Sequence, residues 1–406
     1  MRHHINRLSL LAAVAALASA CADTNAGPTA PAIGRSEVAY SAVKFWEAGA
    51  TVAWNQTARE LIAARPATST GPTVQLRILA YLTLAQYNAV VMAEDTKDHG
   101  RHASPAAAVG GASVVVLKSF FPDPVDQELI DDKLAEQLAA TPWPGEKQKD
   151  AASGEAAGRA VGAAVVAYAA ADNFNVLPLP PMPVGPSYWY SNTSPPTPSF
   201  RALWGTRPFF LTSADQFRPA DPPAFGSPAF LADLAEIRTL SDTRTPEQLA
   251  IAQLWAPRAA MYMNEVGAGM IVTHKLKERE AAHVLALANM AAFDAHIGCW
   301  DAKFAYWFVR PYQADLAITT PIGKPNHPSY ISGHSCNTAS YAAVLAHAFP
   351  TETALLEGYV TEAGLSRMYG GIHYRFDITA GQQLGRDVAA WAIAHDVVGH
   401  EPFPLD

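Results

Sequence analysis

Residues 327–337 read HPSYISGHSCN, and this short stretch is the most informative part of the chain. Ser332 and Gly333 are typical of a helix start with a tight approach, and the free backbone amides at a helix start readily bind anions. His334 follows at once, which adds a group able to transfer a proton. The segment therefore predicts an anion-binding turn at the beginning of a helix.

A second segment, KFAYWFVRP at 303–311, supplies two cations. Lys303 and Arg310 are seven residues apart, nearly two helical turns, so a helix would place both on one face. The residues between them are aromatic or aliphatic, and two cations in apolar surroundings are costly unless an anion accompanies them. This pattern also predicts an anion site.

A third segment, SRMYGGIHYRFD at 366–377, adds a cation and a second histidine. Paired glycines permit a sharp bend between Arg367 and His373. Asp377 is four residues after His373 and would reach one ring nitrogen in a helix, which would set the tautomer. The three segments together predict an oxyanion cradle, a name we use for Lys303, Arg310, Ser332, the Gly333 amide and Arg367, with a histidine on each side.

Each segment alone has an ordinary explanation, because a Lys/Arg pair is often a solvated face and a His–Asp pair is often a surface contact. Their order and spacing are more specific. K-x6-R-P, then S-G-H, then S-R-x5-H-x3-D closely resembles the signature shared by vanadium-dependent haloperoxidases and type 2 phosphatidic acid phosphatases (PAP2). Ile331 stands where this superfamily usually has proline, a departure that removes no contacting group.

The resemblance implies a role for each matching residue. Vanadate would be the cofactor, and phosphate would compete with it or be the substrate group of a phosphatase. The cradle residues would hold the oxygens, and His373 would bond to vanadium or attack phosphorus. His334 would be the acid/base, and Asp377 would orient His373.

Two positions favour halide oxidation within this resemblance. His327 matches the position where bromoperoxidases carry histidine and chloroperoxidases carry phenylalanine, and Trp300 matches a pocket tryptophan of the haloperoxidases. The plainer interpretation of His327 is a turn residue before Pro328, and that of Trp300 is an ordinary core residue. We therefore expect a haloperoxidase-like enzyme that oxidises bromide or iodide with hydrogen peroxide. A PAP2-type acid phosphatase with a phosphohistidine intermediate, acting on a phosphate ester, and a non-catalytic oxyanion-binding lipoprotein are the alternatives.

The rest of the chain predicts an all-α fold. Helical periodicity is plentiful and alternating strand patterns are scarce, with expected helices near 36–64, 107–120, 125–140, 147–171, 277–308, 334–348, 351–365 and 377–398. Thirteen of the 31 prolines lie in 178–228 among many aromatic residues, so that span is expected to be an ordered, packed loop. The soluble haloperoxidase branch implies two four-helix-type bundles, here 36–175 and 246–406, joined by the Pro-rich segment 176–245.

The first residues predict an export signal. A basic start, a short apolar run and Ala18-Ser19-Ala20 fit a signal peptide over 1–20. Cys21 then resembles a lipobox cysteine that opens a tether over 21–35, although plain secretion or a buried helix remain alternatives. We expect an exported protein of the periplasm or cell envelope that meets the membrane only through this lipid anchor. A net charge of −8 without basic clusters argues against a nucleic-acid partner.

Several other residues of the C-terminal half are left without a chemical role. Cys299 lies four residues before Lys303 and Cys336 two residues after His334, and the pair could form a disulfide or remain two buried thiols. His283, Asp294 and His296 share one expected helix, but their spacing does not put both histidines on one face, so a structural role is expected. The sequence predicts no oligomeric state.

Overall fold

The computed structural model describes residues 49–66, 71–98, 101–140, 146, 149–174, 181–397 and 401–405. Within these ranges the protein is helical, and the strands are one antiparallel pair of two residues each, β1 (Lys97–Asp98) and β2 (Arg101–His102). The expected all-α class is confirmed. The predicted signal peptide and tether, including Cys21, lie outside the described residues.

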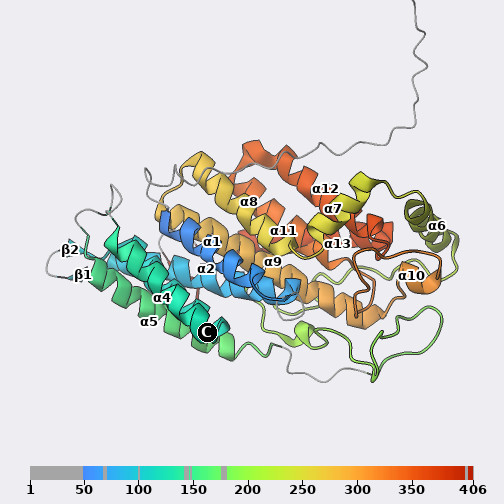
Figure 1. Ribbon diagram of the computed structural model, residues 1–406, viewed down its shortest axis with the longest axis horizontal. Helices are drawn as coiled ribbons and strands as arrows, with labels where there is room; N and C mark the ends of the chain where they lie inside the picture. The colour runs from blue at the N-terminus through green and yellow to red at the C-terminus, as the bar shows by residue number, and fades with distance from the viewer. Residues whose placement is uncertain are drawn as a thin grey trace, which may run out of the picture. The chain divides into compact units, whose positions relative to one another are not determined.

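The described residues of the first half of the chain form five helices, which Figure 1 shows in blue to green. Their starts follow local sequence, because Ser104, Asp123 and Asp150 each cap a helix by accepting a backbone amide hydrogen bond. The last three helices agree with the expected ranges 107–120, 125–140 and 147–171 to within four residues, and the expected stretch 36–48 lies outside the described part. The helices are α1 (Gly49–Ala63), α2 (Pro72–Asp95), α3 (Pro105–Phe120), α4 (Pro124–Ala139) and α5 (Ala151–Ala170).

Helices α3 and α5 approach each other through glycine. Gly154, Gly158 and Gly162 are spaced by four residues and form one stripe along α5. A Cβ atom at Gly158 would overlap the carbonyl of Ala108 on α3, and one at Gly162 would lie 2.9 Å from the carbonyl oxygen of Ala112. The two helix backbones are therefore in direct contact along this stripe.

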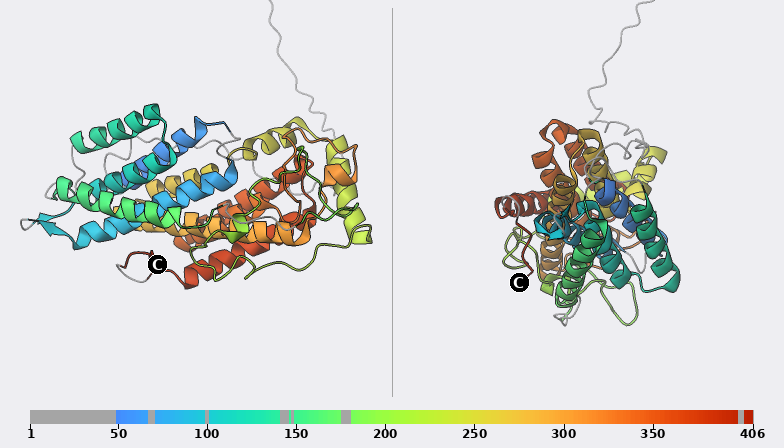
Figure 2. Two further views of the ribbon diagram at one scale, coloured as in Figure 1. Left: turned by 90° about the horizontal axis from the view of Figure 1, so that it is seen from below. Right: turned by 90° about the vertical axis from the view of Figure 1, so that its left-hand side faces the viewer.

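The second half supplies the longest helix, α9 (Glu278–Tyr306), which packs against α2, α11 and α13. Helices α2 and α9 run side by side although they come from different halves of the chain (Figures 1 and 2). The division of the chain into two bundles stays a prediction. The other helices here are α6 (Pro228–Asp242), α7 (Pro246–Trp255), α8 (Ala259–His274), α10 (Pro311–Ala314), α11 (Gly333–Ala348), α12 (Thr353–Tyr369) and α13 (Arg375–Ala394).

The described part of the Pro-rich segment, from residue 181, follows an irregular path broken by one short 3₁₀ turn, η2 (Leu203–Gly205). The buried carboxylate of Asp294 on α9 anchors it by accepting backbone N–H groups of Phe209, Phe210 and Leu211 at 2.7–3.1 Å. Helix α6 lies inside the span expected to be a connection. Its start combines the cap Ser227 with Pro228 in the first turn, where proline needs no amide partner.

One described helix, α2, is long and apolar enough to cross a membrane by length and composition alone. Of its most apolar window, 89% is buried inside the protein. This burial is what a core helix requires, and α2 packs against α3, α5 and α9.

Candidate functional site

Lys303 is completely buried near the C-terminal end of α9. Its ammonium group is held by three carbonyl oxygens of the segment before α11, because Nζ donates to Pro328 at 3.0 Å, Ser329 at 2.9 Å and Ile331 at 2.5 Å. Burial lowers the pKa of Lys303 to about 8, which still leaves it charged at neutral pH. The carbonyl groups therefore fix a cation beside the helix start that the sequence predicts.

Arg310 links the three cradle segments. It is also fully buried, and its guanidinium donates to the carbonyl oxygens of His327 at 3.1 Å and Ile372 at 2.6 Å. The same group contacts two ring nitrogens, Nδ1 of His327 and Nε2 of His373, each at 3.0 Å. The chain thus brings 303–311, 327–337 and 366–377 into one site.

The His373–Asp377 pair has the predicted geometry. Nδ1 of His373 lies 2.7 Å from Oδ2 of Asp377, and this carboxylate oxygen also accepts Ser329 Oγ at 2.6 Å and the Tyr374 amide at 3.2 Å. Burial and the charges of Arg310 and Lys303 hold the pKa of His373 well below its usual range. A neutral ring that donates from Nδ1 keeps a lone pair on Nε2, the nitrogen that Arg310 contacts.

Ser332 and Gly333 begin α11 as expected. Ser332 is the N-cap and accepts the amide of Ser335, while its own backbone amide donates to the carbonyl oxygen of Asp377 at 3.0 Å. His334 lies in the first turn, and its Nε2 is 3.0 Å from the Trp255 carbonyl oxygen at the end of α7. This bond leaves Nδ1 as the ring atom of His334 that is available for other chemistry.

Arg367 completes the set from α12. It is 2% exposed, and its guanidinium donates to Ser366 Oγ and to the Ala252 carbonyl oxygen at 2.9 Å. Burial and nearby Arg310 lower its pKa to about 9. In the described part of the chain, neither Lys303, Arg310 nor Arg367 forms an ion pair with a carboxylate. The buried carboxylate of Asp377 acts electrostatically on Lys303 and Arg310, but it offsets one of three buried positive charges, and a bound anion would compensate the others.

Trp300 and His327, the two residues predicted to form the pocket, lie together beside the cradle. Their ring centroids are 5.0 Å apart, and Lys303 Nζ is 5.5 Å from the Trp300 ring. Burial and the two neighbouring cations hold the pKa of His327 well below its usual range, so this wall of the site is polar but uncharged.

The sequence-based interpretation missed His296. This residue is buried, and its ring centroid lies 4.2 Å from that of Trp300. The helical spacing could have revealed it, because His296 is four residues before Trp300 and seven before Lys303, which places all three on one helical face.

Cys299 and Cys336 are both free and buried in the structure, so the bridge that the sequence left open is not formed. The Cys299 thiol donates to the carbonyl oxygen of Ile331 at 3.5 Å, the same carbonyl that Lys303 contacts. Burial raises the pKa of Cys336 well above its usual range. Both cysteines are therefore explained as buried thiols that pack like small apolar side chains.

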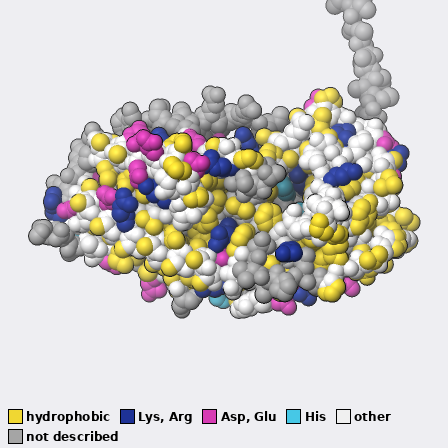
Figure 3. Space-filling view, turned by 60° about the horizontal axis from the view of Figure 1, so that its bottom comes forward, with side chains coloured by type: hydrophobic (Ala, Val, Ile, Leu, Met, Phe, Trp, Pro, Cys, Tyr) yellow, Lys and Arg dark blue, Asp and Glu magenta, His cyan; other side chains and the backbone are white. Residues whose placement is uncertain are grey.

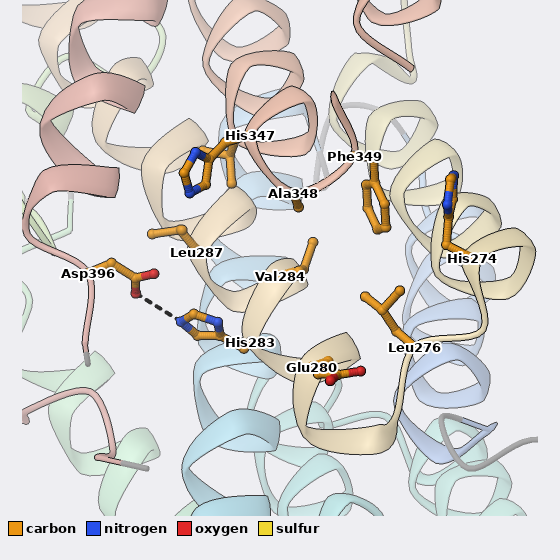
Figure 4. Close-up of a pocket in the computed structure, with 11 residues that line it drawn as sticks. His274, Leu276, Glu280, His283, Val284, Leu287, His347, Ala348, Phe349 and Asp396 are labelled. Carbon is orange, nitrogen blue, oxygen red and sulfur yellow. Dashed lines mark hydrogen bonds and ion pairs between the residues drawn. The ribbon is translucent and has the colours of Figure 1, made fainter. Parts of the chain in front are cut away.

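Two cavities in the described part of the protein are lined by none of the cradle residues. One of about 470 Å³ lies between the start of α9 and the end of α11, where His283 contacts Asp396 at 2.9 Å (Figure 4). A second, of about 840 Å³, is lined by α13, Tyr330 and residues 217–223. On the face in Figure 3, acidic and basic side chains are interspersed over the described residues without a continuous basic patch. The described residues contain no cluster of three or more His, Cys, Asp or Glu side chains that could hold a metal cation.

Comparison with known proteins supports the signature. Residues 282–397 match the PAP2 superfamily model. A bacterial vanadium-dependent iodoperoxidase shares the fold with a TM-score of 0.69 and 24% identity, covering 86% of this chain and 96% of that one. A holo-type bacterial vanadium-dependent chloroperoxidase gives a TM-score of 0.62 and 15% identity, covering 82% and 96%. No protein with curated annotation matches the sequence. The superfamily expected from the motif is confirmed, and the structural likenesses establish the fold.

Proposed function

Since residues 282–397 are a PAP2 superfamily segment, we propose that this protein is a vanadate-dependent haloperoxidase-like enzyme that oxidises halide with hydrogen peroxide. The observation that carries the proposal is that three buried cations, Lys303, Arg310 and Arg367, all act electrostatically on His373, and that Arg310 contacts its Nε2 at 3.0 Å. A cradle of cations and helix-start amides suits an oxyanion rather than a metal cation.

The residues present fit vanadate. Lys303, Arg310, Arg367, Ser332 and the Gly333 amide would hold its oxygens, and Nε2 of His373 would bind the metal. When bound, vanadate supplies a Lewis-acidic centre that activates peroxide towards attack by halide. Asp377 keeps the proton of His373 on Nδ1, so the lone pair that a ligand or nucleophile requires lies on Nε2, where Arg310 contacts it in this structure.

His334 is the group of the site best placed to move a proton. It stands in the first turn of α11, and burial together with Arg367 holds its pKa well below the usual range. A neutral ring whose Nε2 is bonded to the Trp255 carbonyl presents Nδ1 as a proton acceptor. We assign to it the acid/base role.

We expect the purified protein, given orthovanadate, to brominate an electron-rich phenol when peroxide and bromide are present. The activity should disappear when vanadate is removed or when excess phosphate competes for the cradle, because both anions use the same donors. Bromination is followed by absorbance, with a vanadate-free sample as control. Hydrolysis of p-nitrophenyl phosphate without bromination would favour the phosphatase, and anion binding with neither turnover would favour the binder.

We expect bromide or iodide to be oxidised with a kcat/KM roughly tenfold or more above that of chloride, a difference of about 1.4 kcal/mol. The reason is His327, which gives the wall beside Trp300 a polar ring bonded to Arg310. Competition assays with the three halides measure the ratio in the wild type and in His327→Phe. An unchanged ratio in the variant would remove His327 from halide selection.

A further inference from the structure

We propose that His296 is an additional oxyanion-binding residue of the cradle, with Nδ1 as the donor and Thr73 as the anchor of the opposite ring nitrogen. The proposal rests on the proposed function in one respect, namely that the cradle binds vanadate or phosphate. It assigns a role to a histidine outside the motif that identifies the site, and to a threonine in the first half of the chain.

His296 lies on the face of α9 that builds the site. Its ring packs on Trp300 at 4.2 Å between centroids, and Trp300 in turn contacts His327 at 5.0 Å. A Cβ atom on Gly333 would lie 3.2 Å from Cε1 of His296 and 3.1 Å from the Trp300 ring. The imidazole therefore borders the residue whose backbone amide opens α11.

Thr73 fixes the ring from the other side. Its Oγ1 lies 3.0 Å from Nε2 of His296, and both side chains are buried. We assign the hydroxyl as the donor to Nε2, so that the neutral imidazole carries its proton on Nδ1 and presents an N–H donor there. Thr73 comes from the first turn of α2, so a helix of the first half sets the tautomer.

Nδ1 of His296 is buried and has no hydrogen-bond partner within the described protein. Such a group is uncommon, since leaving a buried polar atom unpaired costs free energy, and a ligand would supply the missing acceptor. Burial and nearby Lys303 lower the pKa of His296 to about 3, so the ring adds a donor without adding a fourth charge. An acceptor-rich anion beside Gly333 matches this donor.

Two substitutions separate the ring nitrogens. The amide of His296→Asn falls near the position of Nδ1, whereas the longer His296→Gln places its amide near Nε2 and leaves the Nδ1 position empty. Binding of orthovanadate, and separately of inorganic phosphate, is measured by isothermal titration on each full-length variant. We expect His296→Asn to stay within about threefold of the wild-type Kd and His296→Gln to bind about tenfold more weakly, as for loss of a hydrogen bond to a charged group.

The anchor gives an independent test that leaves the histidine intact. Thr73→Val removes the hydroxyl at nearly constant volume and should weaken anion binding by about threefold, while Thr73→Ser should restore it. Circular dichroism and the Tm of each variant verify folding. Equal affinities for His296→Gln and wild type, or for Thr73→Val and Thr73→Ser, would overturn the proposal. A wild-type protein that binds neither anion would instead overturn the proposed function.

Discussion

Replacing His373 with alanine is expected to abolish turnover, with a loss of roughly 10³-fold or more, as for removal of a reacting group from a catalytic set. The side chain is 3% exposed, Arg310 contacts its Nε2 at 3.0 Å, and Asp377 holds its Nδ1 at 2.7 Å. Among the described histidines beside the cradle, His373 is the one that pairs Nδ1 with a carboxylate and Nε2 with Arg310. Orthovanadate titration should show weak binding or none, and the bromination assay should show no activity above background.

Two matched variants distinguish this result from a general collapse of the site. Asp377→Asn keeps the volume but disturbs the proton on His373, and should weaken vanadate binding by about 10–100-fold. His334→Ala should still bind vanadate but lose turnover, because the proposed function assigns proton transfer to His334 and the bond to the metal to His373. If His334→Ala lost vanadate while His373→Ala retained it, the two histidines would have the opposite roles.

The second large effect concerns stability. Gly158→Ala is expected to destabilise the protein by about 3 kcal/mol, since overpacking of a close contact costs 1–3 kcal/mol and occasionally more. The added Cβ would meet the backbone carbonyl of Ala108, which cannot rotate away as a side chain would. Helices α3 and α5 would have to separate along their whole glycine stripe. Denaturant unfolding of wild type and variant measures the change in the free energy of unfolding.

Gly358 provides a control with the same chemistry and the opposite sign. It lies inside α12, and a Cβ atom there would have no neighbour within 4 Å. Gly358→Ala should therefore stabilise the protein by about 0.5–1 kcal/mol through helix propensity alone. Comparable losses at Gly158 and Gly358 would show that close packing of α3 on α5 is not the cause.

Local sequence signals were sufficient where the effect was itself local. Helical periodicity predicted the ranges of α3, α4 and α5 to within four residues, and the ordered motif predicted that Arg310 and His373 share one site. The four-residue spacing of Gly154, Gly158 and Gly162 is visible in the sequence, and it coincides with the close contact of α5 with α3. These features act within one helix or along one signature, so they can be read without knowing which helices become neighbours.

Long-range partners could not be predicted in this way. The bonds from Thr73 to His296, and from residues 209–211 to Asp294, join segments more than 80 residues apart. Nothing in the sequence near Thr73 differs from an ordinary helix start. The burial that keeps His296 neutral likewise depends on the packing of α2, α9 and α11, which only the folded chain defines.

Residues outside the signature contact the site, and this limits which segments of such a protein can be exchanged by recombination. A gene exchange at the boundary of 282–397 would transfer every residue of the oxyanion cradle. It would leave behind Thr73, which meets His296, and the carbonyl groups of Ala252 and Trp255, which hold Arg367 and His334. A chimaera made from distant relatives would thus combine the cradle residues of one protein with the contacting residues of another. Productive recombinants must exchange the preceding helices together with the signature.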